Sequence, residues 1–209
     1  MVDKKNKIDT IFFDIGGVLI NIHPERTYQY ISDCTGIPLE KIMTSFPLDS
    51  HEKYEMGLIN DREWYKAVYK SMPKGTILIE KDFWLAWKLL LGEQTDVIKI
   101  IKALKKQYSI WLLSNTNPRH INHEIKTKYE FINEIDGAIY SYDVGCIKPD
   151  PKIFYRAVKN AGTKIDNCIF IDDLKSNVES AKNVGIISIQ FVSIKKLIED
   201  LIIIGVNGL

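Results

Sequence analysis

Four groups of polar residues, each after a strand-like apolar segment of its own, carry the side chains that could do chemistry. In chain order they are Asp14, Ser114-Asn115-Thr116-Asn117, Lys148-Pro149 and Asp172-Asp173. Mg²⁺ prefers hard oxygen ligands and usually takes one or two carboxylates together with water and phosphate oxygens. Lysine adds a compact positive charge that stabilises phosphoryl oxygens. The four groups together therefore predict Mg²⁺-assisted chemistry on a phosphate.

Each group alone is common in proteins, because an aspartate after a strand more often caps a helix or forms a turn. The prediction depends on their order and on the strand that precedes each of them. Asp14 and Asp173 are the predicted metal ligands, with Asp172 as a further ligand that acts behind them or through water. The predicted groups for phosphoryl or substrate oxygens are Ser114, Asn115, Thr116 and Lys148.

The elements that must position these groups are short apolar strands that alternate with helices. This alternation is typical of an α/β fold, here a Rossmann-like parallel sheet with helices on both faces. The predicted strands are Thr10–Asp14, Ser109–Ser114, Gly137–Ser141, Cys168–Asp172 and Ile186–Phe191. The predicted helix boundaries are Thr95 as a cap before Val97, Asp150-Pro151 as a start with Gly162 as its end, and Ser193 as a start with Gly205 as its end. Ligands of such sheets bind at the carboxyl ends of the strands, where all four groups lie.

The connection between the first two predicted strands is far longer than an ordinary βα crossover, and its sequence predicts helices throughout. The predicted helices are Pro24 to about Thr35, Pro38 to Phe46, Ser50 to Met56, one capped by Asn60 with Glu63, and Glu80 to Leu91. We therefore predict a core made of residues 1–20 and 95–209, with residues 21–94 inserted as a helical cap domain over the strand ends. Its aromatic residues are expected to form the core of the cap: Trp64, Tyr65, Tyr69, Phe83, Trp84 and Trp87.

Composition, net charge and cysteine spacing bear on which partners and which cellular compartment are expected. The 209 residues are 45% hydrophobic and 26% charged, with a net charge of +1, which gives no electrostatic reason to expect nucleic acid or a membrane. The first seven residues are polar and contain no signal-peptide apolar region, and the apolar runs are too short to span a bilayer. Three widely spaced cysteines form neither a zinc pattern nor a disulfide framework. A cytoplasmic protein is expected.

The four groups resemble the motifs of the haloacid dehalogenase (HAD) superfamily, which run strand-Asp, strand-Ser/Thr, Lys and strand-Asp-Asp in this order. The resemblance covers essentially the whole chain, including a helical cap after the first motif. The branch with bacterial α-D-glucose-1-phosphate phosphatases is the most similar, in the Asp-x-Gly-x-Val start at Asp14, the cap segment 51–59 and the Ser114–Asn117 run.

The resemblance implies a Mg²⁺-dependent phosphatase that acts on a small phosphorylated metabolite, with sugar phosphate as the leading class. Asp14 matches the nucleophile that becomes an aspartyl-phosphate. Ser114 and Lys148 match the groups that hold the phosphoryl oxygens. Asp14 and Asp173 match the Mg²⁺ ligands, together with the backbone carbonyl of Gly16.

The chain departs from most phosphatases of the superfamily at Gly16, where they carry an aspartate as general acid and base. Loss of such a group typically costs roughly 10²–10⁴-fold in rate. A replacement acid could come from the cap, where His51, Glu52 and Glu55 are the candidates. An easily departing group, such as an anomeric phosphate, is the second explanation.

Other functions stay open at this point. A catalytically weak or inactive binding or regulatory protein is favoured by Gly16 alone. A haloacid dehalogenase shares the aspartate nucleophile and lacks the second aspartate, but it needs no metal, so the Asp172-Asp173 pair argues against it. A phosphomutase needs the missing acid even more and ranks lowest.

Several lesser signals have mainly structural interpretations. His120 and His123 lie three residues apart on a predicted helix, but no third metal ligand is near, so solvation or packing against the cap is favoured. Asn177 is expected either to orient the acidic loop or to cap the next helix. Nothing marks Cys146 as a reactive thiolate.

Overall fold

The computed structural model describes residues 7–209, so the polar segment 1–6 lies outside the described residues. Its centre is a parallel five-stranded sheet in the order β5-β4-β1-β6-β7. The strands are β1 (Thr10–Phe13), β4 (Ser109–Ser114), β5 (Gly137–Tyr140), β6 (Cys168–Asp172) and β7 (Ile187–Gln190). All five predicted strands are confirmed, with ends that agree within one residue.

The register of β1 explains why the polar groups meet. Thr10 pairs with Ser109 of β4 on one side and with Cys168 of β6 on the other. Because the three strands start level and run in parallel, they also end level, and the residues after them lie at one edge of the sheet.

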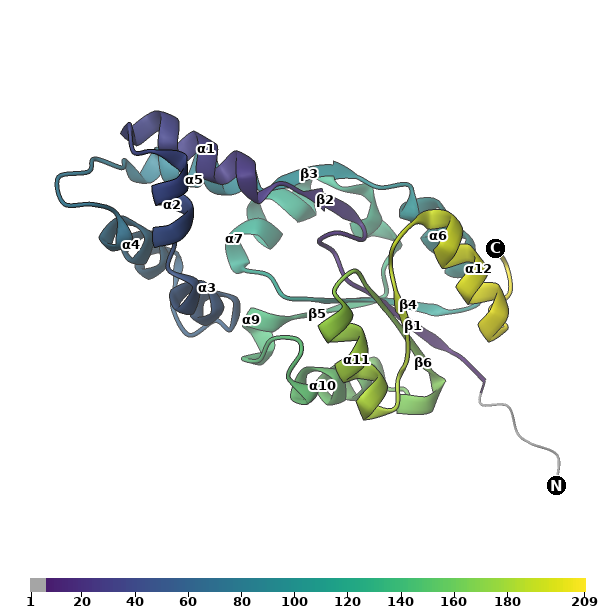
Figure 1. The fold of residues 1–209 in the computed structure, drawn as a ribbon. Coiled ribbons are helices and arrows are strands. Elements are labelled where there is room, and N and C mark those ends of the chain that lie inside the picture. Colours follow the sequence, from purple (N-terminus) through teal and green to yellow (C-terminus); the bar gives the residue numbers. More distant parts are fainter. Residues whose placement is uncertain (1–6) are drawn as a thin grey trace, which may run out of the picture.

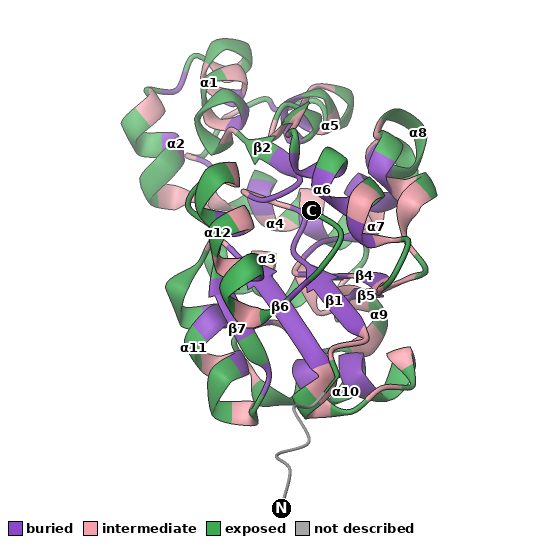
Figure 2. Ribbon diagram, turned by 90° about the vertical axis from the view of Figure 1, so that its right-hand side faces the viewer, coloured by how far each residue is buried: buried purple, intermediate pink, exposed green. Residues whose placement is uncertain are grey.

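Helices cover both faces of this sheet, as predicted (Figure 1). On one face α6 (Val97–Leu104) and α12 (Ile194–Ile204) pack on the strands, and on the other face α10 (Pro151–Ala161) and α11 (Lys175–Val184) do so. The central strands β1 and β6 are buried along their length and the outer sides of the helices are exposed, as Figure 2 shows. The fold is therefore a Rossmann-like α/β fold.

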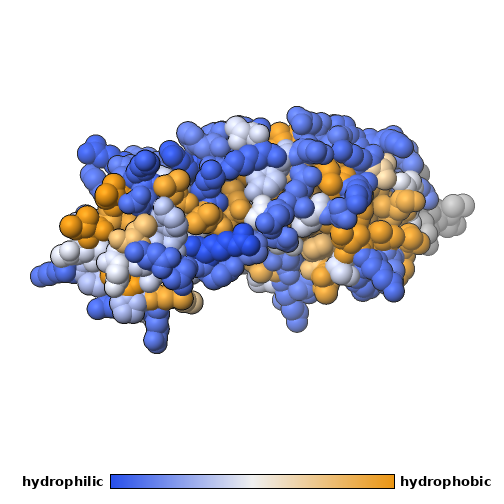
Figure 3. Space-filling view, turned by 90° about the horizontal axis from the view of Figure 1, so that it is seen from above, coloured by the Kyte–Doolittle hydropathy of each residue, from blue (hydrophilic) through white to orange (hydrophobic). Residues whose placement is uncertain are grey.

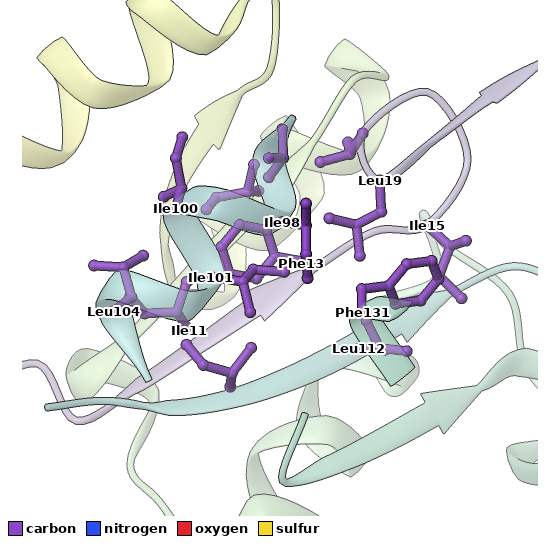
Figure 4. Close-up of a cluster of buried hydrophobic side chains, with 14 of the residues drawn as sticks. Ile11, Phe13, Ile15, Leu19, Ile98, Ile100, Ile101, Leu104, Leu112 and Phe131 are labelled. Atoms are coloured by element: carbon purple, nitrogen blue, oxygen red, sulfur yellow. The ribbon is translucent and has the colours of Figure 1, made fainter. Parts of the chain in front are cut away.

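The alternating side chains of β1 tie the two faces together. Ile11 and Phe13 point into the cluster with Ile101 and Leu104 of α6, shown in Figure 4, and Phe12 points into the cluster on the opposite face. All three β1 side chains are completely buried. A strand covered on both faces has to be apolar at every position, which is why the run Ile11-Phe12-Phe13 shows no alternation of polar residues.

The predicted helix boundaries in the core are confirmed with one correction. The Asp150 side chain accepts a hydrogen bond from the Lys152 N–H, and the Ser193 side chain accepts one from the Lys196 N–H. The N-cap position of α6 is Asp96, whose side chain makes no cap hydrogen bond, whereas the Thr95 hydroxyl before it accepts from the Val97 N–H at 3.3 Å. The Thr95 hydroxyl donates to the Val18 carbonyl at 2.7 Å, so it ties the helix start to the loop after β1.

Residues 21–94 contain five helices, as predicted. They are α1 (Pro24–Thr35), α2 (Leu39–Ser45), α3 (Leu48–Glu55), α4 (Asp61–Ser71) and α5 (Glu80–Lys88). The capping box of Asn60 and Glu63 is present at α4. Helix α3 begins two residues earlier than predicted, and α5 ends before Leu91.

An antiparallel ribbon of β2 (Ile20–Ile22) and β3 (Leu91–Gln94) was not predicted. It carries the chain from the sheet to the helices of the insert and back (Figure 1). Its strands are too short to show a period, and Gly92 reads as a break. The glycine is needed because a Cβ at position 92 would collide with the ring of His23.

The five inserted helices share an aromatic core of their own, which includes Tyr54, Trp64, Phe83 and Trp87. Of the aromatic residues expected there, Tyr65 and Trp84 are partly buried and Tyr69 is exposed. The division of the chain into a core and a cap at residues 21–94 stays a prediction.

Short elements complete the described chain: α7 (Pro118–His120), a π-helical turn Ile121–Ile125, α8 (Lys126–Lys128), α9 (Ser141–Val144) and 3-10 turns at Glu130–Glu134 and Ile165–Asn167. None of the helices in residues 7–209 is long and apolar enough to cross a membrane. Figure 3 shows one face on which hydrophilic side chains predominate and apolar ones form separate patches.

The core packing predicts the effect of a cavity in the central sheet. Leu112 in β4 is completely buried, so Leu112→Ala should lower the free energy of unfolding by about 2–5 kcal/mol. Ile203→Ala on α12, where the side chain is 79% exposed, should change it by no more than about 0.5 kcal/mol. Urea denaturation followed by circular dichroism measures both values, and equal effects would contradict this description of the core.

Candidate active site

Lys148 lies at the centre of the polar groups, buried to all but 3% of its surface. Its ammonium contacts Asp14 Oδ1 at 2.9 Å and Asp172 Oδ2 at 2.6 Å. It also donates to the main-chain carbonyl of Leu113 at 2.9 Å. An ammonium has three donors, so these contacts orient it completely. The loop after β5 thus brings the predicted lysine between the ends of β1 and β6.

The buried charges shift one another's pKa. Burial raises the pKa of Asp14 to about 6, Lys148 opposes this rise, and Asp172 adds to it. Burial pulls the pKa of Lys148 down, but the two carboxylates outweigh burial and hold it above the ordinary value. The lysine therefore stays charged at neutral pH. It favours the ionised form of Asp14, which a nucleophile or a metal ligand requires.

Asp172 is completely buried, and both of its oxygens accept hydrogen bonds. Oδ1 accepts from the Leu174 N–H at 2.8 Å and from the Asn177 amide at 3.0 Å, while Oδ2 accepts from Lys148 and again from Asn177. Asn177 therefore orients the acidic loop, and it does not cap α11, whose N-cap is Leu174.

The carboxylates can be tested for a fit to a divalent cation. Asp14, Asp172 and Asp173 each offer one oxygen, and these three oxygens lie within 4.8 Å of one another. Gly17 has a positive φ of 73°, and a Cβ at this position would overlap the Asp173 carboxylate, so glycine permits its approach. Asp173 is the partly exposed member, open to a ligand. A hard-oxygen donor set of this kind fits Mg²⁺.

Ser114 and its neighbours end β4 beside these carboxylates. Ser114 is buried, and its hydroxyl makes only a long contact, 3.4 Å, with the Asn115 carbonyl. The Asn115 side chain is engaged on both atoms by the main chain of Lys148, at 2.7 and 2.9 Å. Asn115 therefore holds the lysine loop to β4.

One residue that positions the site was overlooked in the sequence. The Ser141 hydroxyl accepts from the Thr116 N–H and donates to the Thr116 carbonyl, so it fixes the loop after β4. Its only signal in the sequence was its place at the end of a predicted strand.

A cavity of about 270 Å³ lies between this edge of the sheet and the inserted helices. Gly16, Ser114, Asn115 and Thr116 line it from the sheet side. His51 and Glu55 line it from α3, where their i, i+4 spacing puts both on one face. Glu52 is exposed and does not line the cavity, so two of the three candidate acids are placed near the site.

Burial changes the titration of both cavity residues. It raises the pKa of Glu55 to about 7, with Lys148 opposing the rise and Asp14 adding to it. It lowers the pKa of His51 to about 4. The two side chains lie 3.8 Å apart. Glu55 is thus protonated in part at neutral pH, as a general acid must be.

His120 has the packing role that was favoured, because its ring stacks on Trp87 of α5 with centroids 5.1 Å apart. His123 is exposed and lies apart from the cavity. Cys146 is buried, and burial raises the pKa of its thiol, which suits a structural residue.

Proteins of known sequence or structure resemble this chain over most of its length. D-ribitol-5-phosphate phosphatase of Bacteroides thetaiotaomicron is 28% identical, over 85% of this chain and 89% of that protein. A sesquiterpene phosphatase of Aspergillus oryzae is 25% identical, over 85% of this chain and 86% of that protein. The crystal structure of a HAD-family enzyme from Bacteroides thetaiotaomicron, in complex with magnesium and inorganic phosphate, superposes with a TM-score of 0.80 at 26% identity, over 91% of this chain and 98% of that one.

The haloacid dehalogenase-like hydrolase family matches residues 8–185. This span includes all four polar groups, the inserted helices and four of the five strands of the central sheet. The chain therefore belongs to the haloacid dehalogenase-like hydrolase family.

Proposed function

We propose that this protein is a Mg²⁺-dependent phosphatase that hydrolyses a small phosphate monoester through an aspartyl-phosphate on Asp14. The observation that carries the proposal is the buried contact of Lys148 with Asp14 and Asp172, with Asp173 beside them and Ser114 at the neighbouring strand end. The relatives named as phosphatases support this reaction class. The magnesium and phosphate of the similar crystal structure support the cofactor.

Asp14, Asp173 and the main-chain carbonyl of Gly16 would hold the Mg²⁺ ion. When bound, the ion neutralises charge on the phosphoryl oxygens. Asp172 is in the predicted ligand set, and we assign it the task of holding Lys148, because its oxygens already accept hydrogen bonds from protein donors.

In the first step an Asp14 carboxylate oxygen attacks phosphorus, and the bond from phosphorus to the ester oxygen breaks. Lys148 and the Ser114 hydroxyl stabilise the equatorial phosphoryl oxygens, as positioned cations and donors do in phosphoryl transfer. The departing alkoxide takes a proton from Glu55, which lines the cavity from the cap side.

In the second step the Glu55 carboxylate takes a proton from a water molecule, whose oxygen attacks the phosphorus of the aspartyl-phosphate. This step releases inorganic phosphate, regenerates the Asp14 carboxylate and leaves Glu55 protonated. One carboxyl group therefore serves as acid and then as base, which removes the need for an aspartate at position 16.

The proposal includes residues 21–94 as a cap domain that supplies the acid and encloses the leaving group. Sugar phosphate is the leading substrate class that the resemblance implies. Asn115 and Thr116 were expected to bind substrate; both line the cavity, and their contacts support a role in holding the loops of the site.

The role of Asp14 predicts complete dependence on its carboxylate. Asp14→Asn should lower kcat by roughly 10³-fold or more, because the amide is a poor nucleophile and a weaker metal ligand. Removal of Mg²⁺ with EDTA should abolish phosphate release, and added Mg²⁺ should restore it. A continuous phosphate assay over a panel of esters measures both effects.

Full activity of Asp14→Asn would contradict the proposal. Halide release from 2-haloacids, assayed in parallel, tests the dehalogenase alternative and is expected to be absent. Mg²⁺ binding without turnover of any ester would instead support a binding protein.

The role of Glu55 predicts a pH profile. A general acid acts in its protonated form, so kcat/KM should fall as the pH rises through about 7, the pKa of Glu55. Glu55→Gln should lower kcat by roughly 10²–10⁴-fold and remove this alkaline limb. Glu52→Gln is the matched control, because Glu52 lies on the same helix but outside the cavity, and it should keep the wild-type profile. An unchanged profile in Glu55→Gln would exclude Glu55 as the acid.

A further inference from the structure

The volume and the lining of the cavity beside Ser114 indicate what kind of leaving group the substrate carries. Its volume of about 270 Å³ is near the lower end of the roughly 300–1,000 Å³ typical of ligand pockets. This volume favours a substrate with a small organic group. The chemistry of that group follows from which lining atoms still have hydrogen bonds to offer.

Most polar side chains on the cavity wall are already paired within the protein. The Thr27 hydroxyl donates to the Ala86 carbonyl at 2.9 Å. The amide of Asn117 makes hydrogen bonds with His120 through both its oxygen and its nitrogen. The second ring nitrogen of His120 contacts the Trp87 carbonyl at 2.9 Å. Like Asn115, these side chains are already oriented by partners within the protein, so they have less capacity left for a substrate.

Few polar groups remain. Within the described chain, the lining side chains that keep most of their hydrogen-bonding capacity are Ser114, Thr116, Tyr28, His51, Glu55 and Trp87, whose indole N–H is buried without a partner. Ser114 and Thr116 lie at the phosphoryl end, and Glu55 is engaged by the ester oxygen in the proposed reaction. The Tyr28 hydroxyl, the His51 imidazole and the Trp87 indole N–H then remain for the rest of the leaving group.

The remaining wall on the cap side is apolar. It is formed mainly by Ile22 and Leu91 of the ribbon, Phe46, Leu48 and Trp87. Phe46 and Trp87 are nearly parallel, with ring centroids 6.4 Å apart, and Tyr28 meets Phe46 edge to face. Such a wall binds hydrocarbon and flat rings, with a gain of about 0.8 kcal/mol for each CH₂ group buried.

From this wall we infer that the substrate is the phosphate monoester of a small, mainly apolar alcohol, and not of a polyol; the inference rests on the proposed function. Each hydroxyl of a sugar or polyol that enters without a partner costs about 1–3 kcal/mol. With three cap groups available, a polyol chain that carries more hydroxyls than this would leave the excess unpaired. Hydrocarbon or an aromatic ring meets no such cost. One relative is named for a polyol phosphate and another for a sesquiterpene substrate, so both kinds of leaving group occur among proteins similar to this chain.

The test compares esters whose leaving groups are all primary alcohols, so that their intrinsic reactivities are similar. With saturating Mg²⁺, kcat/KM should be at least about tenfold higher for benzyl phosphate than for ribitol 5-phosphate, whose chain carries more hydroxyls than the cap groups can pair. Equal or higher kcat/KM for the polyol ester would overturn the inference and leave the proposed function intact. No hydrolysis of any ester would instead refute the proposed function.

A pair of variants tests the wall itself. Leu48 lines the cavity and is 66% exposed, whereas Leu58 is 64% exposed and lies outside it. Leu48→Asn should lower kcat/KM for benzyl phosphate by about threefold and leave that for the polyol ester unchanged or improved. Leu58→Asn should change neither. Equal effects of the two variants, or an unchanged ratio of substrates in Leu48→Asn, would overturn the inference.

Binding without turnover gives an independent measure. Benzylphosphonate cannot be hydrolysed, and it should alter tryptophan fluorescence through Trp87 at a concentration at least about tenfold lower than a polyol phosphonate does. Equal or tighter binding of the polyol phosphonate would overturn the inference, whatever the catalytic rates are.

Discussion

The site depends on one buried interaction, the ammonium of Lys148 held between the carboxylates of Asp14 and Asp172. Removal of one partner from a buried ion pair is strongly destabilising, by roughly 3–5 kcal/mol, because it leaves a charge without compensation. Two asparagines hold Lys148 and Asp172 in place. Asn115 makes hydrogen bonds with the main chain of Lys148, and Asn177 donates to the Asp172 carboxylate. With Asp173, three carboxylates face one ammonium, and the excess negative charge makes the site attractive to a divalent cation.

The polar groups of this site could be predicted from sequence because of the geometry of a parallel sheet. Residues directly after Phe13, Ser114 and Asp172 have to meet at one edge once their strands pair in register. The paired contacts could not be predicted in the same way. That the Asn115 amide faces the lysine main chain, or that Ser141 holds Thr116, depends on loop conformations that spacing does not determine.

The cap was harder to predict than the sheet for a physical reason. Its helices could be located from their caps, such as Asn60, but their packing is set by aromatic contacts between segments far apart in the sequence. The ribbon at Gly92 was missed because short antiparallel strands have little local signal. Glu55 was one of three candidate acids, and the cavity now distinguishes it from Glu52. Position 16 itself does not require glycine, since its φ is not positive and a Cβ there would meet only Ile22.

The stacking of His120 on Trp87 has a consequence for motion between the sheet and the inserted helices. His120 belongs to α7, close to the end of β4, and Trp87 belongs to α5. Any displacement that lifts α5 from α7 has to break a buried hydrogen bond, worth about 1 kcal/mol, and expose one face of an indole ring. Exchange of substrate and product by such a displacement would therefore be an activated process. This contact, which lies on the wall of the cavity, would contribute to its barrier.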